Sequence, residues 1–366
     1  MSCSIYLGTR KGLLVVDLDD SGRPGVPRCV GFNGATVTMV LANELDGTLY
    51  AALNHGHFGV KLHRSSDRGQ TWEECGVPAI PPAGEGEDPS KAVALSEIWS
   101  LENGGQQHPD TLWCGTIPGA VFKSGDRGTT WQLVESLWNR PERREWFGGG
   151  KDHSGVHSIC VDPRNGDHVR IGISCGGVWF TGDGGKTWSI QTTGMRAEYM
   201  PPERQFDGNI QDPHRLVQCP GQPDHFWVQH HNGIFYSSDC CESWTEISKP
   251  ALSGFGFAVV VDPHDGRRAW FVPAVKDECR VPVENRLAVT RTTDGGQSFD
   301  VLKNGLPNEM VWDIVFRHAL AIDQTGKCLA MGSTTGSLWT SIDAGATWRH
   351  VSAHLPTVYC VVISGL

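Results

Sequence analysis

Histidines gather in a few short segments of this chain, where their ring nitrogens could transfer protons. The chain holds 15 histidines, and two pairs stand in "NHGHFG" and "QHHNG". A neutral imidazole can accept a proton as a general base, and the imidazolium can return it as a general acid. We therefore predict a catalytic group whose members are His55, His57, His153, His230, His231 and, to neutralise a substrate carboxylate, Arg10 of "GTRKG".

A second set of residues suits a divalent metal ion. When "SEIWSLEN", "GVHSICVD", "DPHRLVQC" and "GFAVVVD" are aligned by the turns that follow them, Glu97, His157, His214 and Phe257 fall at equivalent positions. Glu97, His157 and His214 together could bind Zn, Mn, Fe or Ca, which the sequence does not distinguish. Such a metal could activate water or polarise a carbonyl. The metal-free alternative is acid and base catalysis on a sugar or similar polyol.

Long segments without a repeat pattern supply candidate substrate-binding residues. Two of them read "VESLWNRPERREWFGGGKDHSG" and "QTTGMRAEYMPPERQFDGNIQDP". Long connections between regular elements are usually functional or disordered. In this chain we expect disorder mainly in residues 84–90. From these segments and their neighbours we predict substrate contacts by Trp146, Tyr199, Arg215 and His354.

A repeated motif defines the elements that must position these residues. Ser/Thr-x-Asp-x-Gly-x-Ser/Thr-Trp occurs as "SSDRGQTW", "SGDRGTTW", "TGDGGKTW" and "SIDAGATW", with altered copies "SSDCCESW" and "TTDGGQSF". The aspartates recur at steps of roughly 50 to 60 residues: Asp67, Asp126, Asp183, Asp239, Asp294 and Asp343. A catalytic motif is needed once, so six regular copies indicate architecture.

Each copy follows a series of short apolar runs separated by turns. "VTMVLANELDGTLYAALNHGHFGVKLHRSSDRGQTW" reads as strand, Asp-Gly turn, strand, loop, strand, box and strand, and the same order fits "VWDIVFRHALAIDQTGKCLAMGSTTGSLWTSIDAGATW". Six units carry a box, and a seventh is divided between about residues 1–32 and 355–366. We therefore predict an all-β protein: one seven-bladed β-propeller domain, residues 1–366, of four-stranded antiparallel blades. The C-terminal strand joins the N-terminal blade and closes the ring.

On these boxes the chain resembles the BNR/Asp-box repeat proteins, which are sialidase-like β-propellers of the WD40/YVTN/BNR-like type. The resemblance implies that each box lies between the third and fourth strands of a blade, on the face opposite the ligand site. With the histidines on that other face, we expect a hydrolase or lyase acting on a small carbohydrate-like or lactone-like substrate in a His-rich central pocket.

Two alternatives remain open at this point. The resemblance also covers non-enzymatic binding or assembly scaffolds, because Asp-box propellers serve in receptors and assembly factors. An exo-sialidase type of glycoside hydrolase is the second alternative, but the family's Phe-Arg-Ile-Pro-type motif near the N-terminus is absent from this sequence.

Composition limits the partners and the compartment. A formal net charge of −10 and a pI near 5.8 disfavour a nucleic-acid or anionic-membrane binder, since both need a basic surface. We expect a small-molecule or saccharide substrate and no nucleotide cofactor. The first residues, "MSCSIYLGTRKG", lack the apolar stretch of a secretory signal, so we expect a cytoplasmic protein.

Overall fold

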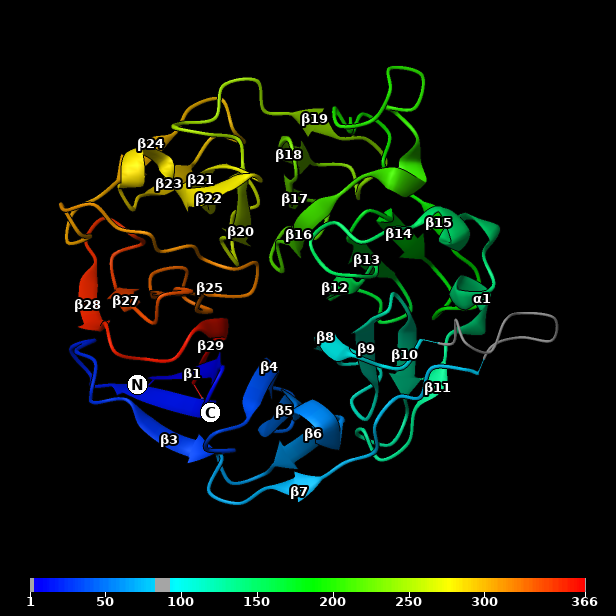
Figure 1. Cartoon of the computed structure of the whole chain (residues 1–366), viewed down its shortest axis with the longest axis horizontal. Helices are drawn as coiled ribbons and strands as arrows, with labels where there is room; N and C mark the ends of the chain where they lie inside the picture. Colours follow the sequence, from blue (N-terminus) through cyan, green and yellow to red (C-terminus); the bar gives the residue numbers. More distant parts are fainter. Residues whose placement is uncertain (1–2, 83–92, 366) are drawn as a thin grey trace.

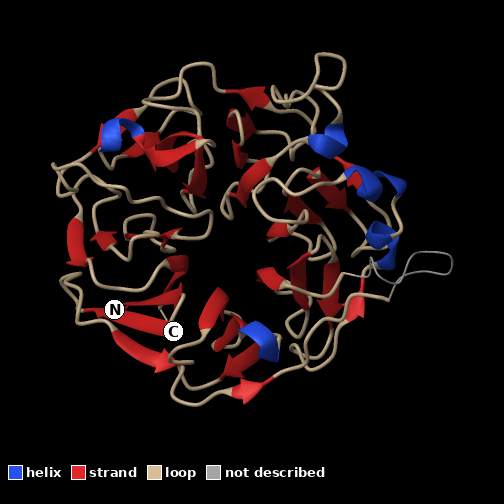
Figure 2. Ribbon diagram, in the orientation of Figure 1, coloured by secondary structure: helices blue, strands red, loops and turns tan. Residues whose placement is uncertain are grey.

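Seven antiparallel sheets form a ring around a central channel (Figure 1). The computed structural model describes residues 3–82 and 93–365, so the whole segment expected to be disordered, residues 84–90, lies outside the described residues. Strands and loops make up almost all of the described chain (Figure 2). Its helical turns are short: α1 (Glu135–Trp138) and the 3-10 turns Gly56–Phe58, Pro141–Glu145, Gly208–Ile210 and Val283–Asn285. The predicted all-β, seven-bladed propeller is confirmed. None of the described helices is long and apolar enough to span a membrane.

Six of the sheets follow one another along the chain. The first three comprise β4–β7 (Thr36–Asn43, Thr48–Asn54, Val60–Ser65, Glu73–Glu74), β8–β11 (Glu97–Asn103, Leu112–Ile117, Val121–Ser124, Gln132–Leu133) and β12–β15 (Val156–Val161, Val169–Ile173, Gly177–Thr181, Ser189–Ile190). The next three comprise β16–β19 (Pro213–Gln218, Phe226–His230, Gly233–Ser237, Thr245–Glu246), β20–β24 (Gly256–Val261, Ala269–Lys276, Cys279–Pro282, Val289–Thr292, Asp300–Leu302) and β25–β28 (Leu320–Ile322, Leu329–Gly332, Leu338–Ser341, Arg349–Ser352). The β20–β24 blade has a fifth strand, because β22 pairs with the end of β21.

The seventh sheet joins the two ends of the chain. Its order is β29 (Val358–Ser364), β1 (Cys3–Thr9), β2 (Gly12–Leu18) and β3 (Arg28–Gly31). β29 runs antiparallel to β1, with Ser364 opposite Ser4 and Val358 opposite Thr9. This pairing confirms the predicted closure and covers the edge that β1 would otherwise expose.

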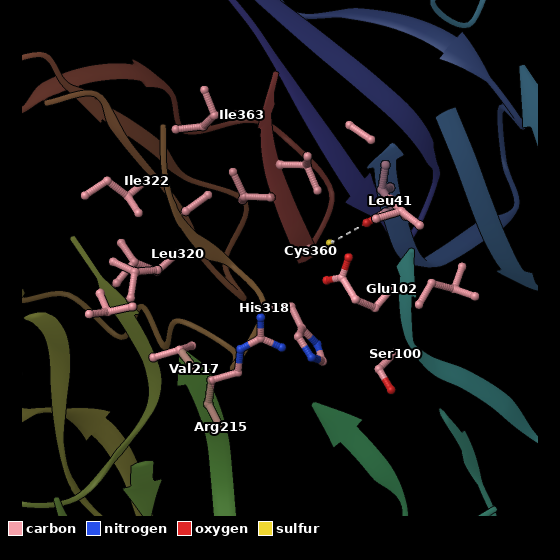
Figure 3. Close-up of a pocket in the computed structure, with 18 of the residues that line it drawn as sticks. Leu41, Ser100, Glu102, Arg215, Val217, His318, Leu320, Ile322, Cys360 and Ile363 are labelled. Carbon is pink, nitrogen blue, oxygen red and sulfur yellow. Dashed lines mark hydrogen bonds between the residues drawn. The ribbon is translucent and has the colours of Figure 1, made fainter. Parts of the chain in front are cut away.

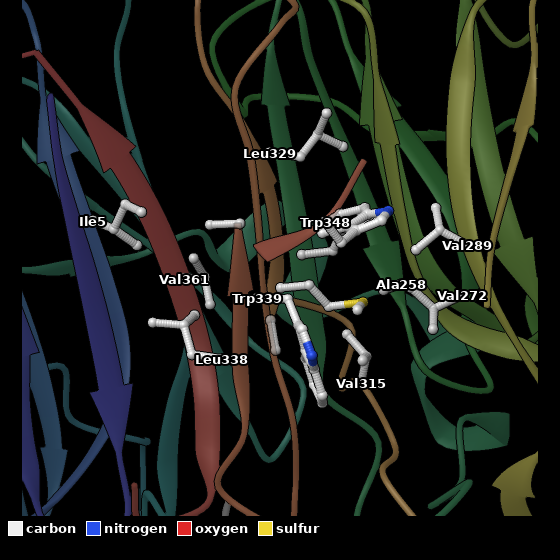
Figure 4. Close-up of a cluster of buried hydrophobic side chains, with 14 of the residues drawn as sticks. Ile5, Ala258, Val272, Val289, Val315, Leu329, Leu338, Trp339, Trp348 and Val361 are labelled. Atoms are coloured by element: carbon white, nitrogen blue, oxygen red, sulfur yellow. The ribbon is translucent and has the colours of Figure 1, made fainter. Parts of the chain in front are cut away.

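Apolar side chains fill the space between the closing blade and its neighbours. One cluster takes Ile5 from β1, Val361 from β29, Trp339 from β27 and Val272 from β21, all 5% exposed or less (Figure 4). Trp348 of the last box joins the same cluster. Because side chains from both ends of the chain interlock here, closing the ring also buries a large apolar area.

The repeated boxes are self-contained turns between third and fourth strands. In the copy between β10 and β11, Ser124 Oγ donates to Asp126 Oδ1 at 2.7 Å and accepts from Gly128 N–H at 2.8 Å. The Thr130 N–H donates to the same Asp126 Oδ1 at 2.8 Å. Equivalent bonds surround the other five aspartates. The carboxylates are thus occupied by their own turns, as an architectural role requires.

Tryptophans of the boxes also connect neighbouring blades. Trp72 Nε1 donates to the Val30 carbonyl at 3.0 Å, and Trp131 Nε1 donates to the Gly76 carbonyl at 3.0 Å. Each bond runs from one blade to the outer edge of the preceding one. The boxes therefore fix how the blades pack at the end of the ring opposite the connections between blades.

The innermost strands carry β-bulges at the other end of the channel. In β8, Ile98 lies opposite Thr116 and Ser100 opposite Gly115, so Trp99 is an extra residue. β12 and β16 skip His157 and His214 in the same way. A bulge interrupts the alternation of side chains between the two faces of a strand. Trp99, not Glu97, is therefore the counterpart of His157 and His214, which corrects the predicted alignment.

The same correction places Glu97 two residues before the bulge of β8. Asp212 stands two residues before the bulge of β16, so Asp212 is the counterpart of Glu97. The unit that begins at Val311 also differs from expectation, because its first strand, β25, covers only Leu320–Ile322. Residues 311–317 are irregular and bring Arg317 to the channel.

Removing residues 356–366 should abolish cooperative folding or lower the melting temperature by more than ~10 °C. The truncation exposes the edge of β1 and removes Val358, Val361 and Ile363 from the core, each contributing roughly 1.5–3 kcal/mol by burial. Circular dichroism melting and size-exclusion chromatography measure the outcome. A chain lacking only residues 365–366, which follow β29, should melt like the full chain. Equal melting of both truncations would contradict the role assigned to the closing strand.

Candidate functional site

A cavity of about 380 Å³ opens at the end of the channel that carries the bulges. Its walls include Trp99, Phe316 and Tyr359, and its polar lining includes Glu97, Lys151 and Arg317. Phe316 and Tyr359 stack with ring centroids 5.8 Å apart and planes 7° from parallel. The volume falls in the range of small-molecule sites, and the mixture of aromatic walls with a few charges is typical of them.

Arg317 is the central charge of this cavity. Its Nε donates to the His214 carbonyl at 2.7 Å, and its guanidinium lies 4.3 Å from the centre of the Trp99 ring. Burial lowers the pKa of Arg317 to about 10, which still leaves the group charged at neutral pH. Among the described residues no acceptor bonds its two Nη groups. The side chain is therefore held by one edge and retains donors for a ligand.

The second cation of the cavity is paired. Lys151 Nζ lies 2.9 Å from Glu97 Oε2, and the Glu97 side chain is 13% exposed. Glu97, predicted as a metal ligand, therefore sits in a salt bridge on the cavity wall. Its carboxylate and the Lys151 ammonium largely neutralise each other, so the net positive charge of the cavity comes from Arg317.

Beside Arg317 lies a cluster formed by Asp212, His214 and His231, called here the Asp212 cluster. Their ligand atoms all lie within 4.8 Å of one another. His214 Nε2 and His231 Nδ1 are each 3.4 Å from Asp212 Oδ2. Burial would raise the pKa of the Asp212 carboxyl, but the two imidazoles outweigh it and hold that pKa well below its ordinary value. The bond to Asp212 raises the pKa of His231 in turn.

Backbone and side-chain donors hold Asp212 in one orientation. Its Oδ1 accepts from the Cys175 N–H at 3.0 Å and from Ser174 Oγ at 3.2 Å, both in the turn between β13 and β14. Gly149 passes so close that a Cβ there would lie 2.7 Å from Cys175 Sγ and 3.1 Å from Asp212 Oδ2. A side chain at that position would push against the Cys175 thiol and crowd the carboxylate.

His230 supports the Asp212 cluster rather than reacting in it. It is fully buried, and its Nε2 accepts from the Asp212 N–H at 3.0 Å. Its Nδ1 lies 3.4 Å from the Asn232 N–H. Burial lowers the pKa of His230 to about 3, so the ring stays neutral. The predicted catalytic role of His230 is therefore not supported by its position, whereas His231 lies in the cluster.

His157 and Arg215 lie deeper in the channel than predicted. The His157 ring is fully buried, its Nδ1 is 2.8 Å from Ser158 Oγ, and burial holds its pKa well below the ordinary value. Its carbonyl accepts from His318 Nε2 at 2.7 Å and from Arg215 Nη1 at 3.3 Å. Among the described residues, His157 does not join Glu97 and His214 in a group with metal-binding spacing. The predicted Glu97, His157 and His214 metal site is not brought together.

Arg215 faces a different part of the channel from the cavity around Arg317. Figure 3 shows Glu102, Arg215 and His318 around the space between the innermost strands, which is closer to the face with the boxes. Burial raises the pKa of Glu102 to about 7, and the charge of Arg215 opposes the rise. Arg215 therefore lies away from the mouth of the channel, where it was predicted to contact a substrate.

Of the remaining predicted residues, Trp146 lies in a core, Tyr199 lies beside the Asp212 cluster, and the others are exposed. Trp146 is 8% exposed and packs edge-on against Trp179 in an apolar core, since its segment covers the space between two blades. Tyr199 contacts the His231 ring edge-on at 5.0 Å, and its hydroxyl donates to the Ile210 carbonyl at 2.6 Å. Exposed positions outside the lining of the cavity are occupied by Arg10, His55, His57, His153 and His354.

The sequence analysis missed three charged residues of the site, Asp212, Arg317 and Lys151, and the aromatic walls of the cavity. Asp212 could have been found from the spacing to His214, which equals the spacing from Glu97 to Trp99 once the bulges are aligned. No spacing in the sequence indicates Arg317. The residues before it read as a strand, but in the structure they are irregular.

Comparisons with known proteins support the fold and a distant link to glycoside hydrolases. No family model matches this chain. A probable oligoxyloglucan-reducing end-specific xyloglucanase of Neosartorya fischeri is 28% identical over 141 residues, which is 38% of this chain and 15% of that protein. A solved protein from Lactobacillus plantarum has a TM-score of 0.62 at 13% identity, covering 100% of both chains. An ancestral GH74 enzyme has a TM-score of 0.58 at 13% identity, covering 90% of this chain and 38% of its own.

Glu102→Gln should change the pH dependence of stability. A folded-state pKa near 7, against the ordinary 4.5, means that the native state loses stability as pH rises from 4.5 to 7. The variant lacks this loss, so its stability relative to the wild type should increase by up to about 3 kcal/mol between pH 5 and pH 8. Urea unfolding at both pH values measures it. The exposed Glu242→Gln control should follow the wild type, and a Glu102→Gln difference that does not vary with pH would contradict the raised pKa.

Proposed function

We propose that this chain is a hydrolase or lyase whose substrate is a small saccharide carrying a carboxylate, bound in the cavity around Arg317. The observation that carries the proposal is the guanidinium itself, half-buried beside Trp99 and bonded to the protein only through Nε among the described residues. A planar guanidinium with free donors matches a carboxylate with two parallel hydrogen bonds. Burial strengthens such a bond, because water competes less for the donors.

The walls of the cavity suit the ring of a sugar. Trp99, Phe316 and Tyr359 offer apolar aromatic surface to the C–H groups of a saccharide. The Glu97 and Lys151 pair and Asn54 offer acceptors and donors to hydroxyl groups. The similarity to a probable xyloglucanase agrees with a saccharide ligand, although the match covers a small part of that protein.

The Asp212 cluster would supply the chemistry. Arg317 connects it to the cavity, because the guanidinium bonds the carbonyl of His214. His231 is the accessible member, with 24% of its side chain exposed. An imidazole next to a buried carboxylate can take a proton from water or from a sugar carbon and return it to a leaving group. Hydrolysis and elimination both need such proton transfer.

The sialidase alternative is less well supported by the geometry. That chemistry uses a tyrosine activated by a glutamate as nucleophile, whereas the Tyr199 hydroxyl donates to a backbone carbonyl. Tyr359 does line the cavity, where its ring stacks on Phe316, but the carboxylate beside it, Glu97, is held by Lys151. A non-enzymatic saccharide-binding protein would use the same cavity and differs from an enzyme only in turnover.

A panel of saccharides tests the proposal. We expect uronate-containing oligosaccharides to be cleaved, with products identified by mass spectrometry, and neutral xylo-oligosaccharides to bind more weakly. Arg317→Gln should raise KM by about 10- to 100-fold, the range for losing a charged hydrogen bond, with a smaller effect on kcat. Arg10→Gln, which removes an exposed arginine outside the cavity lining, is the matched control.

Two results would count against this function. Equal KM values for the Arg317→Gln and Arg10→Gln variants would remove Arg317 from the substrate site. Tight binding of acidic saccharides without turnover of any would favour the binding protein over the enzyme.

A further inference from the structure

We propose that Asp212, His214 and His231 together bind a divalent first-row transition metal ion. The three residues come from separate places in one blade: the connection into β16, the bulge of β16, and the turn between β17 and β18. Their ligand atoms lie within 4.8 Å of one another, and among the described residues this is the group of histidine, cysteine and acidic side chains with such spacing.

The hydrogen bonds of His214 leave a lone pair facing a carboxylate. His214 Nδ1 lies 2.7 Å from the Gly256 carbonyl, which can only accept, so Nδ1 carries a hydrogen. In the neutral ring Nε2 then has a lone pair, and its polar neighbour is Asp212 Oδ2 at 3.4 Å. Two acceptors facing each other in a buried site repel unless a proton or a cation lies between them. His214 is 2% exposed, so water cannot readily relieve the contact.

The distances suit a metal ion in that position. Two ligand atoms about 2.1 Å from a zinc-sized ion, at a tetrahedral angle, are about 3.4 Å apart. Both imidazole nitrogens have this separation from Asp212 Oδ2. Direct N–H to carboxylate hydrogen bonds are usually shorter, at about 2.7–2.9 Å. The partly exposed His231 ring, on a turn, has room to complete the geometry.

The surroundings of the three residues also match those of metal ligands. A ligating imidazole usually donates its other N–H to a carbonyl or carboxylate, as His214 does to Gly256. A ligating carboxylate is usually bonded through its second oxygen, as Asp212 Oδ1 is by Ser174 and the Cys175 N–H. These contacts orient one lone pair of His214 and one of Asp212 toward the common centre.

The ligand set identifies the class of metal. Two imidazoles with one carboxylate favour Zn²⁺, Fe²⁺ or Mn²⁺ over Ca²⁺ and Mg²⁺, which prefer oxygen ligands. Three protein ligands leave coordination positions open, as in catalytic rather than structural sites. The inference deepens the proposed function, and its chemical consequence rests on that function: the ion would activate a water beside the substrate carboxylate on Arg317. Metal binding itself requires no saccharide.

The experiment measures metal binding without substrate. The full chain, purified without an affinity tag and treated with a chelator, is titrated with Zn²⁺ by calorimetry and with Co²⁺ by visible absorption. We expect about one ion per chain and Co²⁺ d–d bands shaped by imidazole ligands. His231→Ala should lower the affinity at least about tenfold, since even loss of an outer-shell partner costs 10- to 100-fold. His153→Ala, an exposed histidine outside the cluster, should bind like the wild type.

The outcomes separate this inference from the proposed function. The metal site is overturned if the wild type takes up no Zn²⁺, Co²⁺, Mn²⁺ or Fe²⁺, or if His231→Ala takes up as much metal as the wild type. A proton would then lie between His214 Nε2 and Asp212 Oδ2 in place of the ion. Metal uptake that depends on His231, in a chain that turns over no saccharide, supports the metal site and overturns the function. Circular dichroism of each variant checks that it is folded.

Discussion

One extra residue in the innermost strands determines which side chains reach the mouth of the channel. A regular strand would present alternate residues to the channel from end to end. The bulges at Trp99, His157 and His214 break this alternation near the start of the strand, so the residues before and after each bulge keep different registers. Asp212 and His214 meet in one cluster before the ladder resumes at Arg215, and Glu97 and Trp99 line one cavity before it resumes at Ser100.

The fold could be predicted because its signals repeat. Six boxes at a nearly constant step define the blades, and the incomplete runs at the two ends of the chain can be completed only by each other. The face of the site could also be predicted, since His214, His231 and Glu97 lie at the end opposite the boxes. The register of the innermost strands could not be predicted, because no residue type in a strand-forming run such as "GVHSICVD" indicates that a bulge is present. Without the bulges, the alignment put Glu97 level with His157 and His214 as a metal ligand. In the structure the carboxylate that contacts His214 is that of Asp212.

The backbone of the ring also limits how charges can enter the channel. Arg317 bonds the carbonyl of His214, while Arg215 and His318 share the carbonyl of His157. Bulges free such carbonyls, because the extra residue drops out of the ladder of hydrogen bonds between strands. A buried cation usually needs a carboxylate as its partner. In this channel the free carbonyls take that place, so the cations do not each need a buried carboxylate. The bulges thus supply carbonyls that hold the positive charge at the mouth, while the irregular segment 311–317 supplies the charge itself.

The neighbouring residues His230 and His231 show how position decides the chemistry of identical side chains. His230 is the last residue of β17 and points into the protein, where burial keeps it neutral and its Nε2 accepts from the Asp212 N–H. His231 begins the turn, where its ring is partly exposed and faces Asp212. One histidine fixes the backbone of Asp212 and the other contacts its carboxylate. A substitution at His230 would therefore disturb the cluster through the position of Asp212, while a substitution at His231 would remove a functional group and leave the frame intact.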